Sequence, residues 1–85
     1  MKISYLPTFV KKFDALEAGL QKEILEKIEL FKSISNHKRL NVHKLHGRFK
    51  NRYSFSVNYK YRILFAHLSK EEVVLMTVGD HSIYD

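Results

Sequence analysis

Residues 53–65 read YSFSVNYKYRILF, and this stretch decides the fold class of the chain. Apolar and aromatic side chains alternate with polar ones on both sides of a short polar junction at residues 58–60. A period of two is typical of strands with one buried face, and a short junction between two such strands favours a β-hairpin. We therefore expect one strand over residues 53–59 and a second over residues 61–66.

Two further strands are expected outside this hairpin. Residues 72–78 are apolar on both sides, as in a central strand, and Gly79 ends the run. Near the start of the chain, polar and apolar residues alternate over residues 2–5 before Pro7, which removes an amide donor. This pattern predicts a short N-terminal strand.

Two helices are expected between the first strand and the hairpin. Phe9, Phe13 and Leu16 recur at spacings of four and three, the apolar stripe of an amphipathic helix, and Gly19 is expected to break that helix. A second and longer helix follows, with the stripe Leu20, Ile24, Ile28 and Phe31. Both stripes are interpreted as core contacts.

The order of these elements predicts the fold class. Residues 39–50 are interpreted as a polar connection with Gly47 as its turn. Residues 1–85 are then expected to form a single α+β domain. It consists of a short N-terminal strand, two helices, and a three-stranded antiparallel meander with the helices packed on one face.

Cationic residues are concentrated in the middle of the chain. The net charge is +6, from 15 Lys and Arg against nine Asp and Glu, yet no acidic residue lies between Glu29 and Glu71. Ten like charges without neighbouring acids repel one another, which favours contact with nucleic acid or an acidic protein over an ordinary solvated face. These residues are Lys32, Lys38, Arg39, Lys44, Arg48, Lys50, Arg52, Lys60, Arg62 and Lys70.

Composition disfavours several other classes of protein. A content of 45% hydrophobic and 13% aromatic residues is too high for a disordered tail. The chain has no cysteine, which excludes disulfides and thiolate metal sites and suits a cytoplasmic protein. Its apolar runs are too short to span a membrane, and its N-terminus does not resemble a signal peptide.

Three residues near the end of the chain carry candidate chemistry. Side chains alternate across a strand, so Arg62 points away from the helices if its two neighbours face them. There its guanidinium suits bidentate phosphate binding, although it can also merely shield Leu64. His81 follows the last strand and is a candidate acid or base, or an ordinary surface residue. Tyr84 can stack on a base or donate a proton.

A metal site is considered and set aside. His43 and His46 are three residues apart, a spacing that brings two ligands together on a helix. Their segment is polar and turn-like, however, and no third ligand follows at a fixed spacing. The sequence also contains no glycine-rich phosphate loop, nucleophile elbow or carboxylate pair. No metal and no small-molecule cofactor are expected.

Four segments together resemble the RelE/ParE family of toxins from type II toxin–antitoxin systems. They are HKLHG at residues 43–47, YSFSV at 53–57, YRILF at 61–65 and VGDHSIY at 78–84. The resemblance implies a small α+β domain. For a RelE-like member it implies a ribosome-dependent endoribonuclease that cuts translated messenger RNA, inhibits translation and is silenced by a cognate antitoxin. ParE-like relatives instead inhibit DNA gyrase, and a non-toxic relative that only binds its antitoxin is a third class.

The resemblance also implies roles for individual residues. Arg62 matches the arginine of the family's Tyr-Arg motif, which contacts the scissile phosphate. His81 lies where some YafQ-like and YoeB-like members carry a catalytic histidine, and His43 matches a functional histidine of the YafQ type. Tyr84 resembles the C-terminal tyrosine that RelE uses on its RNA. The sequence departs from RelE where two important lysines are replaced by Tyr53 and Phe55.

The implied reaction is attack of a ribose 2′-hydroxyl on the adjacent phosphodiester. It requires a base, an acid and positive charge on the developing phosphorane, and it requires no metal. We expect His81 to transfer protons with His43 or Tyr84 as its partner, and Arg62 to stabilise charge. RNA would be bound by the basic residues Lys44, Arg48, Lys50, Arg52 and Lys60.

Overall fold

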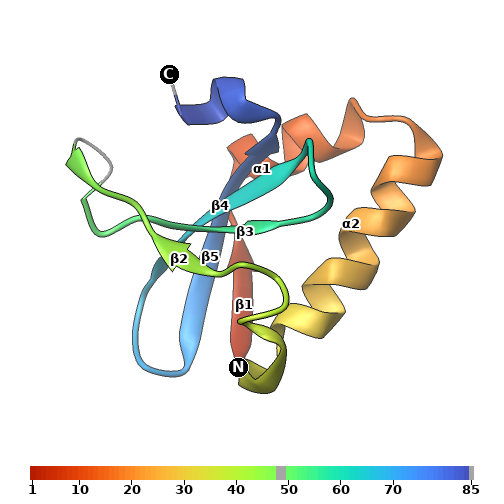
Figure 1. The fold of residues 1–85 in the computed structure, drawn as a ribbon. Helices are drawn as coiled ribbons and strands as arrows, with labels where there is room; N and C mark the ends of the chain where they lie inside the picture. Colours follow the sequence, from red (N-terminus) through yellow and green to blue (C-terminus); the bar gives the residue numbers. More distant parts are fainter. Residues whose placement is uncertain (48–49, 85) are drawn as a thin grey trace.

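The computed structural model describes residues 1–47 and 50–84 (Figure 1). Helices, strands and 3-10 helices (η) follow one another in the order β1 (Lys2–Tyr5), α1 (Pro7–Asp14), α2 (Ala18–Phe31), η1 (Ile34–Asn36), β2 (His43–Lys44), β3 (Tyr53–Ser56), β4 (Arg62–His67), β5 (Glu72–Gly79) and η3 (His81–Tyr84). The α+β class predicted from the sequence is confirmed.

The strands form one five-stranded sheet in the order β1-β5-β4-β3-β2. Strands β3, β4 and β5 make the expected antiparallel meander. Strand β1 lies beside β5 and pairs with it in parallel, with Ile3 opposite Val73. The sheet is therefore mixed. The first strand, β1, forms one edge of it, and the last strand, β5, lies next to β1 in the interior (Figure 1).

The expected polar connection over residues 39–50 contains a strand, so that prediction is wrong in part. Strand β2 pairs antiparallel with β3, with His43 opposite Ser54. The backbone reaches this strand through Asn41, whose φ of 57° lies in the left-handed region that asparagine tolerates better than most residues. Two residues are too few to show a period of two, so β2 left no signal in the sequence.

The break between the two helices is not at Gly19. Helix α2 begins at Ala18, and the side chain of Glu17 caps it by accepting a hydrogen bond from the Leu20 amide at 2.7 Å. A capping carboxylate satisfies an amide that the first turn leaves without a partner. The cap starts the helix one residue before the glycine, and Gly19 lies within the first turn.

Strand β3 is shorter than expected and ends at Ser56. The side-chain oxygen of Asn58 accepts hydrogen bonds from the amides of Lys60 and Tyr61, at 2.9 and 2.8 Å. Asparagine commonly closes a turn in this way. Tyr59, expected to be an inward-facing strand residue, therefore lies at the tip of the turn between β3 and β4.

An aromatic stack joins α2 to the sheet. The ring centroid of Phe31 lies 4.3 Å from that of Phe55 and 4.8 Å from that of Phe65, and all three side chains are buried. His37 stacks on Phe31 at 4.8 Å, and its Nε2 lies 2.7 Å from the Phe31 carbonyl oxygen. Phe31 is thus the central contact between the helical layer and the meander.

Replacing Phe31 with alanine is expected to lower the free energy of unfolding by about 3–5 kcal/mol, because a fully buried ring leaves a cavity. A domain of this size has a total stability of only about 5–15 kcal/mol, so this loss is a large share of it. Urea denaturation followed by circular dichroism measures the change. Ile34→Ala is the control, since this side chain is 76% exposed, and a similar loss there would contradict the prediction.

Candidate functional site

One face of the sheet packs on the helices and the other carries polar side chains. Cross-strand partners project to the same face. His43 pairs with Ser54 across β2 and β3, and Ser56 pairs with Arg62 across β3 and β4. Ile63, next to Arg62, is in the core, so Arg62 points away from the helices as predicted. We call the set His43, Ser54, Ser56 and Arg62 the polar face.

A β-bulge extends the polar face to the end of β5. Phe65 pairs with Leu75 but Leu64 pairs with Thr77, so one extra residue of β5 is accommodated between them. After the bulge, Val78 faces the core while Gly79 lies opposite Arg62. Without the bulge, Gly79 would lie on the helix side.

The guanidinium of Arg62 is fixed by the turn that precedes its strand. Its Nη1 donates hydrogen bonds to the carbonyl oxygens of Asn58 and Tyr61, the latter at 3.1 Å. Both bonds use Nη1, so the Nε and Nη2 donors take no part in them. Because a guanidinium presents its donors in a rigid fork, those two groups suit bidentate contact with a phosphate.

Asn58 ties this turn to α2. Besides closing the turn through its side-chain oxygen, Asn58 donates from Nδ2 to the Glu23 carboxylate at 2.9 Å. One carbonyl that accepts from Arg62 therefore belongs to Asn58, whose side chain is itself held by hydrogen bonds through both its oxygen and its nitrogen. Nothing in the sequence marks Asn58 as more than a turn former, because its role in positioning Arg62 depends on contacts with Glu23 and with Arg62 itself.

The ring of His43 has a defined hydrogen-bonding state. Its Nδ1 lies 2.8 Å from the Asn41 carbonyl oxygen, which can only accept, so Nδ1 carries the proton. In the neutral ring Nε2 then has the free electron pair, and it lies 3.5 Å from the hydroxyl oxygen of Ser54. A carbonyl that fixes the tautomer in this way prepares the other nitrogen to accept a proton.

The 3-10 helix η3 folds back over the Arg62 end of the polar face. A Cβ atom placed on Gly79 would lie 2.4 Å from Cγ2 of Ile83, so this side chain of η3 sits directly on the glycine. Gly79 is opposite Arg62, and His81 is the first residue of η3 and is exposed. Figure 1 shows η3 beside the end of β5 and the turn between β3 and β4. Arg62 and His81 thus lie at the same end of the sheet.

The Asp80 carboxylate places a negative charge at this end of the sheet. Hydrogen bonds from the Ser82 hydroxyl and from its main-chain amide, the latter at 2.9 Å, hold the pKa of the Asp80 carboxyl below its ordinary value. The positive charges of Lys60 and His81 lower this pKa further. Asp80 is therefore an anion at neutral pH, and it directly follows Gly79, which pairs with Arg62.

The predicted RNA-binding residues are distributed around this face. Lys60 lies on the turn beside Arg62 and is exposed, and Lys50 is exposed in the connection before β3. Arg52 immediately precedes β3, and its carbonyl accepts a hydrogen bond from Leu45 at 2.9 Å, which continues the pairing of β2 and β3. Lys44 pairs with Tyr53, so it projects to the opposite side from His43.

Two predicted residues have no side-chain description. Arg48 lies outside the described residues. Tyr84 ends η3, and only its backbone belongs to the described part of the chain. The structure therefore brings together Arg62, His81 and Lys60 at one end of the sheet, with His43 across β3. Strand spacing puts the Cα atoms of His43 and Arg62 about 12 Å apart.

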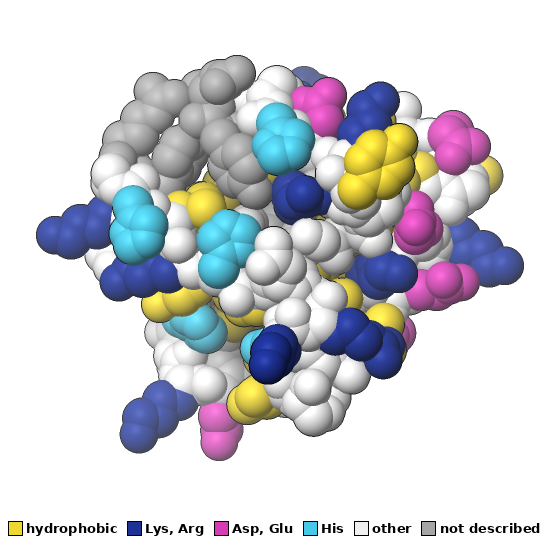
Figure 2. Space-filling view, in the orientation of Figure 1, with side chains coloured by type: hydrophobic (Ala, Val, Ile, Leu, Met, Phe, Trp, Pro, Cys, Tyr) yellow, Lys and Arg dark blue, Asp and Glu magenta, His cyan; other side chains and the backbone are white. Residues whose placement is uncertain are grey.

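Charge is unevenly spread over the surface. Figure 2 shows histidine, lysine and arginine side chains over the part of the molecule where β2 and β3 lie, while most acidic side chains lie towards α2. Within residues 1–47 and 50–84, no group of three or more histidine or acidic side chains could hold a metal ion. In the same ranges, no helix is both long and apolar enough to cross a membrane.

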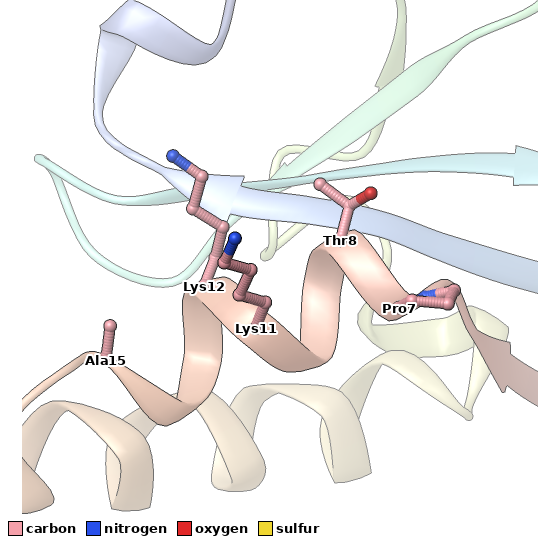
Figure 3. A pocket seen from close by; sticks show the side chains of 5 residues that line it. All are labelled: Pro7, Thr8, Lys11, Lys12 and Ala15. Atoms are coloured by element: carbon pink, nitrogen blue, oxygen red, sulfur yellow. The ribbon is translucent and has the colours of Figure 1, made fainter.

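Two hollows of the described surface lie beside α1. One of about 610 Å³ is lined by Pro7, Thr8, Lys11, Lys12 and Ala15, and Figure 3 shows both lysine side chains extending from the helix beside it. A second, of about 300 Å³, is lined mostly by apolar residues: Tyr5, Phe9, Val10, Phe13, Asp14 and Leu25.

Solved structures share this fold. The conserved hypothetical protein HP0894 from Helicobacter pylori superposes with a TM-score of 0.75 at 17% identity, over 96% of each chain. YafQ from Escherichia coli strain BL21(DE3) gives 0.71 at 14% identity, over 98% of this chain and 96% of that one. The toxin–antitoxin complex RelBE2 from Mycobacterium tuberculosis contains a chain that gives 0.74 at 17% identity, over 94% and 96%.

No protein-family model and no curated protein sequence matches the chain. The likeness is thus one of fold, and it extends over nearly the whole length of each of these structures.

Proposed function

We propose that this protein is the toxin of a type II toxin–antitoxin system, and that it is a ribosome-dependent endoribonuclease that cleaves translated messenger RNA. The observation that carries the proposal is the anchored Arg62 guanidinium, which shares the polar face with the tautomer-defined ring of His43. The fold shared with a toxin–antitoxin complex and the cationic middle of the chain support it.

In this mechanism His43 is the base. Its Nε2 takes the proton of a ribose 2′-hydroxyl, and the 2′-oxygen attacks the adjacent phosphorus. Arg62 stabilises the negative charge that develops on the phosphorane oxygens. His81 donates a proton to the departing 5′-oxygen, so the products are a 2′,3′-cyclic phosphate and a 5′-hydroxyl. Tyr84 is the alternative proton donor.

RNA is held by the five basic residues for which this role was expected from the sequence. Lys60, Lys50 and Arg52 contact backbone phosphates, together with Arg48 and with Lys44 from the edge strand. Such contacts release counterions, so RNA affinity falls steeply as the salt concentration rises. A cognate antitoxin silences the protein in the cytoplasm, where the ribosome and messenger RNA are its other partners.

Expression of the wild-type chain tests the proposal. Growth should stop, and translated messages should show new 5′-hydroxyl ends at defined positions within reading frames. Untranslated transcripts should stay intact in the same cells. If no cuts arise and gyrase supercoiling is lost instead, the ParE-like alternative is correct. If expression without any antitoxin is harmless, the chain is a non-toxic relative that only binds its antitoxin.

Asn58→Ala is expected to lower the cleavage rate about tenfold or more, because the turn that holds Arg62 loses both of its side-chain caps. Asn58→Asp keeps the accepting oxygen but loses the donor to Glu23 and sets two carboxylates against each other, so it should recover only a small part of the rate. Cleavage of a translated message measures both variants, and the far-ultraviolet circular dichroism spectrum reports folding. Equal rates for the alanine variant and the wild type would show that the turn does not position Arg62.

A further inference from the structure

We propose that the ring of Tyr59 is a stacking platform for an unpaired base of single-stranded RNA, next to the phosphate bound by Arg62. The inference rests on the proposed function and adds a base-binding position to it. No base-binding role for this residue follows from the sequence, where Tyr59 was expected to face the core.

Tyr59 is the most exposed of the large apolar and aromatic side chains that the structure describes. It is 91% exposed, compared with 45% for Tyr5. Within residues 1–47 and 50–84, no ring stacking or cation–π contact involves Tyr59, and the ammonium of neighbouring Lys60 lies over Tyr61 instead, 5.6 Å from its centroid. Both ring faces of Tyr59 are therefore open to a ligand, and the ring adds nothing to the core.

The turn that presents this ring is rigid. The amide of Val57 donates to the Tyr61 carbonyl at 3.0 Å, and the Asn58 side chain closes the turn and bonds to Glu23 of α2. A ring on a preorganised turn loses little conformational freedom when it binds. This distinguishes Tyr59 from an exposed aromatic residue on a flexible segment.

Tyr59 is joined directly to the peptide group that holds Arg62. The Asn58 carbonyl, which accepts from Arg62, belongs to the peptide group that joins Asn58 to Tyr59. Lys60 follows directly and is exposed. Aromatic rings interleaved with cations bind single-stranded nucleic acid, since the rings stack on bases while the cations hold the backbone. Stacking suits any base, so Tyr59 contributes affinity and position rather than sequence choice.

The favoured ligand is RNA rather than a protein segment because the surroundings are polar and cationic. An apolar protein anchor needs an apolar collar, but the neighbours of Tyr59 along the chain are Asn58 and Lys60. The exposed apolar side chains Val10 and Leu25 instead lie at the hollow beside α1.

The test uses the full-length protein and a short single-stranded RNA that contains the fluorescent base 2-aminopurine. Tyr59→Ala should weaken binding by about 5- to 100-fold and abolish the fluorescence quenching caused by stacking. Tyr59→Phe should keep both. The salt dependence of binding should be unchanged in Tyr59→Ala, because no phosphate contact is removed. Leu68→Ala, at a side chain that is 58% exposed and lies past the other end of β4, is the matched control.

The outcomes separate this inference from the proposed function. If Tyr59→Ala binds RNA and cleaves translated messages like the wild type, the inference is wrong and the nuclease proposal stands. If Tyr59→Ala loses antitoxin binding while RNA binding is unchanged, the ring serves a protein partner and the inference is also wrong. If the wild type neither binds nor cleaves RNA, both proposals fail.

Discussion

Replacing Arg62 with alanine is expected to reduce messenger RNA cleavage by about 10²–10³-fold and to abolish growth arrest. Loss of one preorganised donor to a charge that develops in the transition state has an effect of this size. The guanidinium of Arg62 is preorganised because two main-chain carbonyls already hold it. Primer extension on a message translated in a purified system measures the loss at each cut site.

Two further variants separate charge from geometry. Arg62→Lys keeps the positive charge but has no fork with which to hold the turn and a phosphate together, so it should recover only a small part of the rate. Arg39→Ala removes an exposed cation outside the polar face and should change the rate less than about twofold. Persistent growth arrest in Arg62→Ala, with an intact fold, would contradict the proposed mechanism.

The meander and the orientation of Arg62 could be predicted because they depend on local pattern. Alternation along residues 53–65 fixes which side chains face the core, and the register confirms that Arg62 and Ile63 lie on opposite faces. The apolar stripes of both helices were likewise visible in the sequence. Their buried members, Phe9, Ile24, Ile28 and Phe31, all belong to the core.

Features that depend on distant partners could not be predicted. Strand β2 is defined by its pairing with β3. Strand β1 pairs with β5, from which two helices and three strands separate it along the chain. The bulge in β5 could not be predicted either. Leu75 and Val78 on its two sides are both apolar, and nothing in the sequence marks the extra residue between them. Yet this bulge puts Gly79 opposite Arg62, and η3 begins two residues after Gly79.

The supporting residues of the candidate site were missed for the same reason. Asn58 is an ordinary turn residue and Ser54 an ordinary strand residue in the sequence. Their importance is visible only in their contacts: Asn58 with Arg62 and Glu23, and Ser54 with His43. Sequence reasoning finds the residues that carry chemistry, whereas the residues that hold them in place are defined by contacts.

Removing either histidine of the proposed mechanism is expected to lower kcat by about 10²–10⁴-fold, the usual effect of losing a general acid or base. The matched control is His46→Ala, an exposed histidine three residues from His43, which should leave kcat unchanged. Cleavage of a translated message under single-turnover conditions measures all three variants. An equal loss in His46→Ala would show that charge in this segment, rather than proton transfer, limits the rate.

The pH dependence then assigns the two roles. A reaction that needs one unprotonated and one protonated group has a bell-shaped profile of rate against pH. His43 keeps its proton on Nδ1, bonded to the Asn41 carbonyl, so its Nε2 accepts a proton only while the ring is neutral. The residual activity of His43→Ala should therefore no longer fall at low pH, and that of His81→Ala should no longer fall at high pH. If the two effects are exchanged, His81 is the base. If both variants keep the full bell, neither imidazole moves the proton, and other groups are the acid and the base.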